Sequence, residues 1–126
     1  MSRKIINGNN VTASGPYSHA VDAGDYVFLS GQTGYNQANY DGKKLSIEDQ
    51  THSAFKNLDE VMQAGNLWYD DVIKVNVFLT SIDDFHPMNE IYKTKFNAPY
   101  PARTCVAVHQ LPLEADVEIE YIIKRK

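Results

Sequence analysis

The chain has 126 residues, a formal net charge of −4 and 43% hydrophobic residues. This size predicts one domain over residues 1–126, with enough apolar residues for a core. The acidic balance argues against a nucleic-acid-binding protein, which normally carries a basic patch or stripe. One cysteine excludes a disulfide within the chain, and no stretch approaches the roughly 20 apolar residues of a membrane span. Because no apolar run of signal-peptide length begins the sequence, we expect a cytoplasmic protein.

The first third of the chain is predicted to form strands. Residues 19–21 and 26–30 flank Ala23-Gly24-Asp25, a turn signal of the hairpin type. Residues 34–44 are polar and rich in Asn, Asp and Gly, which predicts a surface loop.

Residues 46–64 give the clearest helix signal, because their apolar residues recur at helical spacing and form one stripe. Ser46 is the expected N-cap, with Asp49 three residues later in a variant of the capping box. Gly65 is the expected terminator, because glycine adopts the left-handed conformation at little cost.

A strand is predicted over residues 72–80 and a second helix over about residues 84–96. In the strand, alternation puts four apolar residues on one face: Ile73, Val75, Val77 and Leu79. Pro87 is tolerated only in the first turn of a helix, so the second helix should begin near residue 84 or 85. Its expected inward residues are Phe85, Met88, Ile91, Tyr92 and Phe96.

Two further strands follow, and each carries charged residues on the side that we expect to face away from the core. In the first, Val106 and Val108 are expected to face the core, while Arg103 and Cys105 face the other way. In the second, Glu118 and Glu120 face away from four apolar residues: Val117, Ile119, Tyr121 and Ile123.

Each predicted helix has a single apolar stripe, so both are expected to cover one face of one sheet. The opposite face would carry Phe28 and Phe78 beside the charged residues of the last two strands. Two phenylalanines make a fully solvated face unfavourable. Self-association is the simplest cover, because the same face on identical chains can close on itself.

Arg103 is the strongest candidate for a ligand-binding residue. A guanidinium on a partly apolar wall can hold a carboxylate through two parallel hydrogen bonds. The alternative is an ordinary ion pair on an edge strand. Glu118 or Glu120 could orient or deprotonate a water if burial raises the pKa toward neutrality. The alternative for either glutamate is a solvated strand residue or a salt bridge.

Cys105 could act as a nucleophile only beside a base. On a strand, His109 would lie roughly 13 Å away, which favours a small buried hydrophobe at Cys105. The four histidines show no metal-ligand spacing, and no phosphate or dinucleotide fingerprint occurs, so we expect neither a metal nor a cofactor.

Three weaker candidates come from turns and a helix edge. Tyr17, in a Gly-Pro-Tyr-Ser turn, either reaches a ligand or packs on the surface. Gly31, after Ser30, either allows a close backbone approach or forms a bulge. Asn89 is expected at the edge of the packed helix face, or exposed beside it.

Six motifs in order give these residues a common context: Gly15-Pro16-Tyr17-Ser18, Val27-Phe28-Leu29-Ser30-Gly31-Gln32, Val72-Ile73-Lys74-Val75-Asn76-Val77-Phe78-Leu79, Asn89-Glu90-Ile91-Tyr92, Pro101-Ala102-Arg103-Thr104-Cys105-Val106 and Val117-Glu118-Ile119-Glu120. Together they resemble the RidA (YjgF-like) family of reactive enamine/imine deaminases over nearly the whole chain. The resemblance implies a chorismate-mutase-like α+β fold, a mixed sheet with two helices on one face. It also implies a homotrimer with a central β-barrel and clefts between subunits. The last strand would lie between the Val27 and Val75 strands, with the Arg103 strand beyond the latter.

The resemblance further implies hydrolysis of 2-aminoacrylate, 2-iminobutanoate and similar intermediates to 2-oxo acids and ammonia, which detoxifies by-products of pyridoxal-phosphate enzymes. Arg103 would bind the substrate carboxylate and Glu118 would position the attacking water. The backbone of Cys105 would hydrogen-bond the substrate, its thiol not being the nucleophile. The other residues expected to line the cleft are Tyr17, Ser30, Gly31 and Asn89.

Other functions stay open at this point. A small-metabolite-binding regulatory module is one, although related subgroups that do not deaminate imines lack the arginine that this chain keeps at position 103. An RNA-directed translation inhibitor or endoribonuclease is another, which the acidic charge disfavours. A chaperone of the holdase type is a third.

Overall fold

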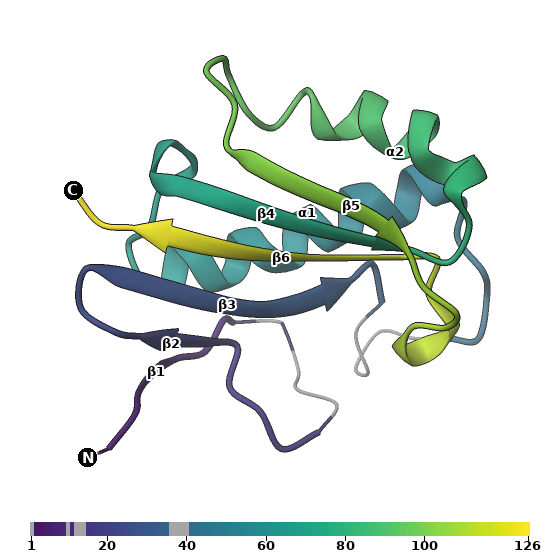
Figure 1. Ribbon diagram of the computed structural model, residues 1–126. Helices are drawn as coiled ribbons and strands as arrows, with labels where there is room; N and C mark the ends of the chain where they lie inside the picture. Colours follow the sequence, from purple (N-terminus) through teal and green to yellow (C-terminus); the bar gives the residue numbers. More distant parts are fainter. Residues whose placement is uncertain (1, 10, 12–14, 36–40) are drawn as a thin grey trace.

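The computed structural model describes residues 2–9, 11, 15–35 and 41–126 (Figure 1). Within these residues, six strands form one sheet in the order β1-β2-β3-β6-β4-β5, in which only the β4–β5 pair is parallel. The strands are β1 (Lys4–Ile6), β2 (Ala20–Asp22), β3 (Tyr26–Thr33), β4 (Val72–Leu79), β5 (Ala102–Ala107) and β6 (Val117–Lys124). The predicted position of the last strand is therefore confirmed, and so is the early hairpin.

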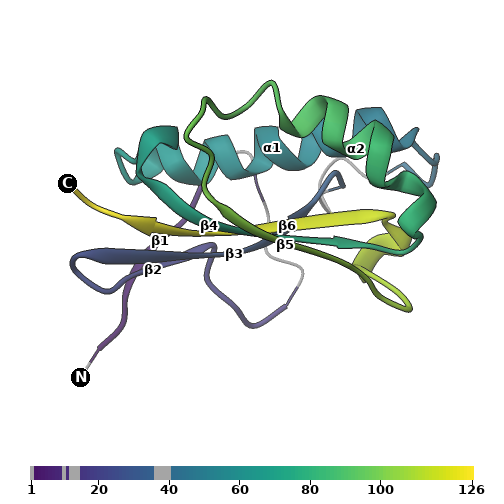
Figure 2. The same ribbon diagram turned by 45° about the horizontal axis from the view of Figure 1, so that its top comes forward.

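Both α-helices, α1 (Ile47–Ala64) and α2 (Phe85–Tyr92), cover the same face of the sheet (Figure 2). Short 3-10 turns precede β4, α2 and β6, at Tyr69–Asp71, Ile82–Asp84 and Pro112–Glu114. The buried core lies between the helices and the sheet and includes Phe55, Leu58, Met88, Ile119 and Tyr121. The mixed α+β sheet with helices on one face is confirmed.

The ends of α1 confirm one prediction and correct another. The side-chain oxygen of Ser46 accepts a hydrogen bond from the backbone N–H of Asp49 at 3.1 Å, as expected of an N-cap. Gly65, however, has an ordinary negative φ of −102°, and Asn66 takes the left-handed conformation with φ 53°. The space at Gly65 is limited instead, because a Cβ there would lie 2.8 Å from Ile6 Cδ1.

Two predicted details near the other elements change, and a third agrees with the structure where it is described. The helix expected to reach residue 96 ends at Tyr92, although Phe96 is still buried. Ile73 is 41% exposed rather than buried, because the β4–β6 register shifts between Val72 and Lys74 and brings Val72 into the core. The expected loop over residues 34–44 has no helix or strand where it is described, and residues 36–40 lie outside the described part.

The face assigned to β5 was wrong. Val75 and Val77, which are fully buried under the helices, pair in register with Arg103 and Cys105. Because paired residues of neighbouring strands point to the same face, Arg103 and Cys105 lie on the helix side of the sheet. Val106 lies on the open side and is 41% exposed. The predicted face of Glu118 and Glu120 is confirmed, since they alternate with the buried residues of β6.

The open face is partly apolar, as the sequence predicted. Phe28 on β3 is 47% exposed there and Val106 on β5 is 41% exposed, with the half-buried Phe78 between them on β4. Across the described residues, the structure contains no helix with the length and hydropathy needed to cross a membrane.

Candidate functional site

Arg103 is held between β5 and α2 by an amide and two aromatic rings. Its Nη1 donates a hydrogen bond of 2.6 Å to Asn89 Oδ1. Its Cζ lies 4.6 Å from the ring centroid of Tyr92 and 5.5 Å from that of Phe85. A flat guanidinium stacks well on ring faces, so these contacts fix its plane while leaving donors available.

A cavity of about 390 Å³ opens beside this guanidinium. Its walls are formed by Asn89, Tyr92, Lys93, Tyr100, Pro101 and Arg103. None of the carboxylates in the described ranges forms an ion pair with Arg103. A positively charged fork with unused donors at a partly apolar cavity is suited to a small carboxylate ligand.

Tyr92 and Tyr100 were not identified as wall residues from the sequence. Tyr92 had the spacing of a core residue, and its buried ring does pack against Phe55 and Phe96. The spacing from Asn89 to Tyr92 places both on one helix face, but only the position of α2 over β5 shows that this face meets Arg103.

Cys105 follows Arg103 on the same face of β5 and packs against the core. Burial raises the pKa of its thiol, and the positive charge of Arg103 only partly opposes this. A thiol that holds its proton is a poor nucleophile. The environment of Cys105 therefore does not favour a nucleophilic thiol.

We predict that Cys105→Ala leaves the imine hydrolysis implied by the family resemblance within about threefold of the native rate, because a protonated thiol is not expected to act as a nucleophile. Steady-state rates and inactivation by iodoacetamide would be compared for the two proteins. A loss of a hundredfold or more in the variant would instead identify the thiol as a participant.

A second group of candidate residues surrounds Glu118 on the open face. Glu118 pairs with Thr33 of β3 and with Phe78 of β4. Burial raises the pKa of its carboxyl, and the nearby charge of Glu120 adds to the effect. Glu120 itself accepts a hydrogen bond of 3.0 Å from Asn76 Nδ2. Glu118 thus has the environment expected of a general base or of a group that orients water.

Ser30 and Gly31 lie beside Glu118, where the β3–β6 register shifts between Leu29 and Gln32. A Cβ at Gly31 would lie 2.9 Å from Glu118 Cδ, so a larger residue at this position would require the Glu118 side chain to move. Ser30 Oγ donates a hydrogen bond of 2.6 Å to the carbonyl of Ser18, which ties the neighbouring Tyr17 segment to β3. The ring of Tyr17 is 42% exposed.

The predicted site residues therefore form two groups rather than one. Asn89, Arg103 and Cys105 lie on the helix side, near β5. The other group, on the open side near β3 and β6, consists of Ser30, Gly31 and Glu118, and the segment of Tyr17 joins it through the bond from Ser30 to Ser18. Arg103 pairs with Val75, and Glu118 pairs with Phe78. Arg103 and Glu118 therefore lie on opposite faces of the sheet. A single chain does not bring the two groups together.

The described ranges contain no group of three or more His, Cys, Asp or Glu side chains that could hold a metal ion. Both groups contain a titratable side chain with a raised pKa. These are the carboxyl of Glu118, the thiol of Cys105 and the phenol of Tyr92, and burial is the main cause for each. Perturbed groups of this kind are common at functional sites.

Comparison with known proteins places this arrangement in context. Residues 7–124 match the family described as Endoribonuclease L-PSP. The chain is 42% identical over 109 residues to a 2-iminobutanoate/2-iminopropanoate deaminase of Dermatophagoides farinae, covering 86% of this chain and 85% of the relative. It is 43% identical over 123 residues to Reactive Intermediate Deaminase A, chloroplastic, of Arabidopsis thaliana, covering 97% of this chain and 66% of the relative.

A solved structure shows the same fold. The chain superposes on E. coli TdcF with bound serine with a TM-score of 0.88 and 38% identity, covering 98% of this chain and 99% of that one. The family match spans more than half of the sequence, and the relatives share over 30% identity across most of it. The chain therefore belongs to the RidA (YjgF-like) family.

Proposed function

We propose that this protein hydrolyses reactive 2-imino acids and their 2-enamino tautomers, such as 2-iminobutanoate and 2-aminoacrylate, to 2-oxo acids and ammonia. The observation that carries the proposal is the Arg103 fork, held by Asn89 and Tyr92 at an open cavity with donors unused. The names of the D. farinae and Arabidopsis relatives support it. The bound serine of TdcF supports an amino-acid-like ligand, which also carries a carboxylate.

The chemistry needs no external electron source or activated group. Water adds its oxygen to the C=N carbon, the nitrogen takes up the protons of that water, and the C–N bond breaks to release ammonia and leave a C=O bond. An imine is already electrophilic, so holding the carboxylate and one water in place supplies most of the required acceleration. Arg103 would hold the carboxylate and the ionised Glu118 would orient the water.

We infer that a complete site forms between two subunits. In one chain Arg103 and Glu118 lie on opposite sides of the sheet, so a substrate held by one cannot reach a water held by the other. A homotrimer with closed threefold symmetry would let the Glu118 side of one subunit meet the Arg103 side of the next. The exposed Phe28 and Val106 on the open face support such a cover.

A direct assay tests the activity. A threonine dehydratase generates 2-iminobutanoate in the presence of semicarbazide, which traps the imine, and the release of 2-oxobutanoate is followed with and without this protein. We expect the protein to accelerate release at the expense of the semicarbazone. Identical traces with and without folded protein would contradict the proposal for this imine.

The remaining alternatives have less support. RNA cleavage, which the family description names, is disfavoured by the net charge of −4, because a nucleic-acid surface is normally basic. No contact in the described residues favours a purely regulatory role over an enzyme. We further propose that residues 1–126 act as one domain in the cytoplasm, although the Arabidopsis relative is named as chloroplastic.

A further inference from the structure

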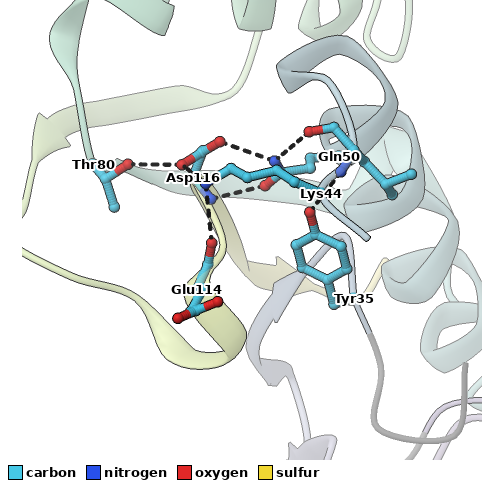
Figure 3. A network of polar contacts seen from close by, with 7 residues as sticks. Tyr35, Lys44, Gln50, Thr80, Glu114 and Asp116 are labelled. Carbon is cyan, nitrogen blue, oxygen red and sulfur yellow. Dashed lines mark hydrogen bonds and ion pairs between the residues drawn. The ribbon is translucent and has the colours of Figure 1, made fainter. Parts of the chain in front are cut away.

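Asp116, the residue directly before β6, uses all of its polar atoms in hydrogen bonds, and Figure 3 shows those of its side chain. Its backbone N–H donates to Gln50 Oε1 at 2.8 Å, and its carbonyl accepts from the Thr80 N–H at 3.1 Å. Its carboxylate accepts from Gln50 Nε2 at 3.0 Å, from Lys44 Nζ at 3.0 Å and from Thr80 Oγ1 at 3.2 Å. The start of β6 is thereby joined to α1, to the end of β4 and to the segment before α1.

The centre of this network is buried, whereas one arm is exposed. Gln50 is fully buried on the first turn of α1, and its Nε2 also donates to the Leu45 carbonyl at 2.9 Å. Burial opposes ionisation of Asp116, but the bonds from Lys44, Gln50 and Thr80 outweigh it and lower the pKa of the carboxyl. A buried and fully bonded polar network resists displacement. Lys44 is largely exposed and contributes a weaker surface ion pair.

The network also reaches β3, which pairs with β6 on the side opposite β4. The Leu45 N–H donates to Tyr35 Oη at 2.8 Å. Thr33 Oγ1 donates to the Tyr35 carbonyl at 3.0 Å and accepts from its N–H at 3.2 Å. Thr33 is the residue of β3 that pairs with Glu118. The two strands on either side of Glu118, β3 and β4, are therefore both connected to Asp116.

We propose that Asp116 and Gln50 are positioning residues, which fix the start of β6 so that the Glu118 carboxylate stays beside Gly31. The catalytic part of this inference rests on the proposed imine hydrolysis. A Cβ at Gly31 would come within 2.9 Å of Glu118 Cδ, so the carboxyl group of Glu118 lies close to the Gly31 backbone. A shift of about 1 Å in a reacting or orienting group is enough to cost about a hundredfold in rate.

The test uses two disrupting variants and a matched control. Asp116→Asn removes the negative charge and replaces one carboxylate oxygen with a donor, so either Lys44 Nζ or Gln50 Nε2 loses its acceptor. Gln50→Leu removes the bonds of the Gln50 side chain to Asp116 and to the Leu45 carbonyl. Asp22→Asn is the control, because it also removes a buried carboxylate bonded to a cation, Arg125, at 2.7 Å. Asp22 lies on β2 opposite Val27, at the far end of β3 from Thr33.

Two measurements are made on each protein: amide hydrogen exchange by NMR and steady-state kinetics of 2-iminobutanoate hydrolysis. In Asp116→Asn we expect exchange of the amides of residues 117–119 to rise about tenfold relative to residues 121–123. We expect kcat to fall at least about tenfold with KM within about twofold, because Arg103 is not displaced. Gln50→Leu should change both measurements in the same direction as Asp116→Asn. Asp22→Asn should change neither the ratio of amide exchange rates along β6 nor kcat.

Uniform acceleration of exchange along β6, or an unchanged kcat beside locally faster exchange, would overturn the positioning role. If Asp116→Asn does not fold, Thr80→Val removes one hydrogen bond from the same carboxylate and is tested in its place, with a smaller effect in the same direction. If the native protein shows no hydrolysis, the proposed function fails. The exchange pattern then decides by itself whether Asp116 and Gln50 fix the start of β6.

Discussion

Arg103→Ala is expected to lower kcat/KM for 2-iminobutanoate hydrolysis by a large factor. A charge-assisted, forked pair with a carboxylate contributes on the order of 2–5 kcal/mol when partly buried. That range corresponds to a loss of roughly thirtyfold to several thousandfold. The substitution also leaves Asn89 Oδ1 without its 2.6 Å partner and removes the stacking on Tyr92, so circular dichroism must show that the variant is folded.

Two further variants separate charge from geometry at this position. Arg103→Lys keeps the positive charge but not the planar fork, and should recover only part of the lost activity. Arg125→Ala removes the same charge elsewhere, at the ion pair with Asp22, and should leave kcat/KM near the native value. If Arg103→Ala retained more than half of the native kcat/KM, the carboxylate-binding role would be wrong.

Glu118→Gln is expected to lower kcat by about a hundredfold or more, as for loss of a positioned general base. Glutamine keeps the size of the side chain, so it fits the same space beside Gly31. The variant therefore tests the charge of residue 118 rather than its packing. The rate is measured by semicarbazide competition, and an unchanged kcat would remove Glu118 from the reaction.

The pH dependence follows from the environment of Glu118. Burial and the charge of Glu120 raise the pKa of its carboxyl above the usual glutamate range. The ionised form is the active one, so the rate should fall as the pH drops through this raised pKa, at a higher pH than for an ordinary glutamate. Glu120→Gln removes the neighbouring negative charge and should move that fall to lower pH. A profile that does not move would exclude Glu118 as the titrating group.

The sequence predicted most elements because local signals agreed with the final fold. The Ser46 cap, the apolar stripe of α1 and the hairpin between β2 and β3 each depend on a few neighbouring residues. The placement of β6 between β3 and β4 came from the family resemblance instead. Alternation defines the two faces of a strand but contains no information about which strands become neighbours.

The face of Arg103 could not be predicted for a related reason. Val106 is as apolar as a core residue, but the open face of this sheet is itself partly apolar, so alternation on β5 did not distinguish the two faces. The parallel register with β4 decides it, and that register is a long-range property. The error concealed the main feature of the candidate site, which is that Arg103 and Glu118 are separated within one chain.

The most direct test of a site shared between subunits is to mix Arg103→Ala and Glu118→Gln protein after mild denaturation and refolding. Each variant alone should be nearly inactive. In a trimer assembled at random from equal amounts, about a quarter of the interfaces would pair an intact Arg103 with an intact Glu118 from the neighbouring subunit. We therefore predict recovery of about a quarter of the native activity. If the mixed and refolded trimers stay as inactive as the separate variants, the two residues do not act together across an interface and the account is contradicted.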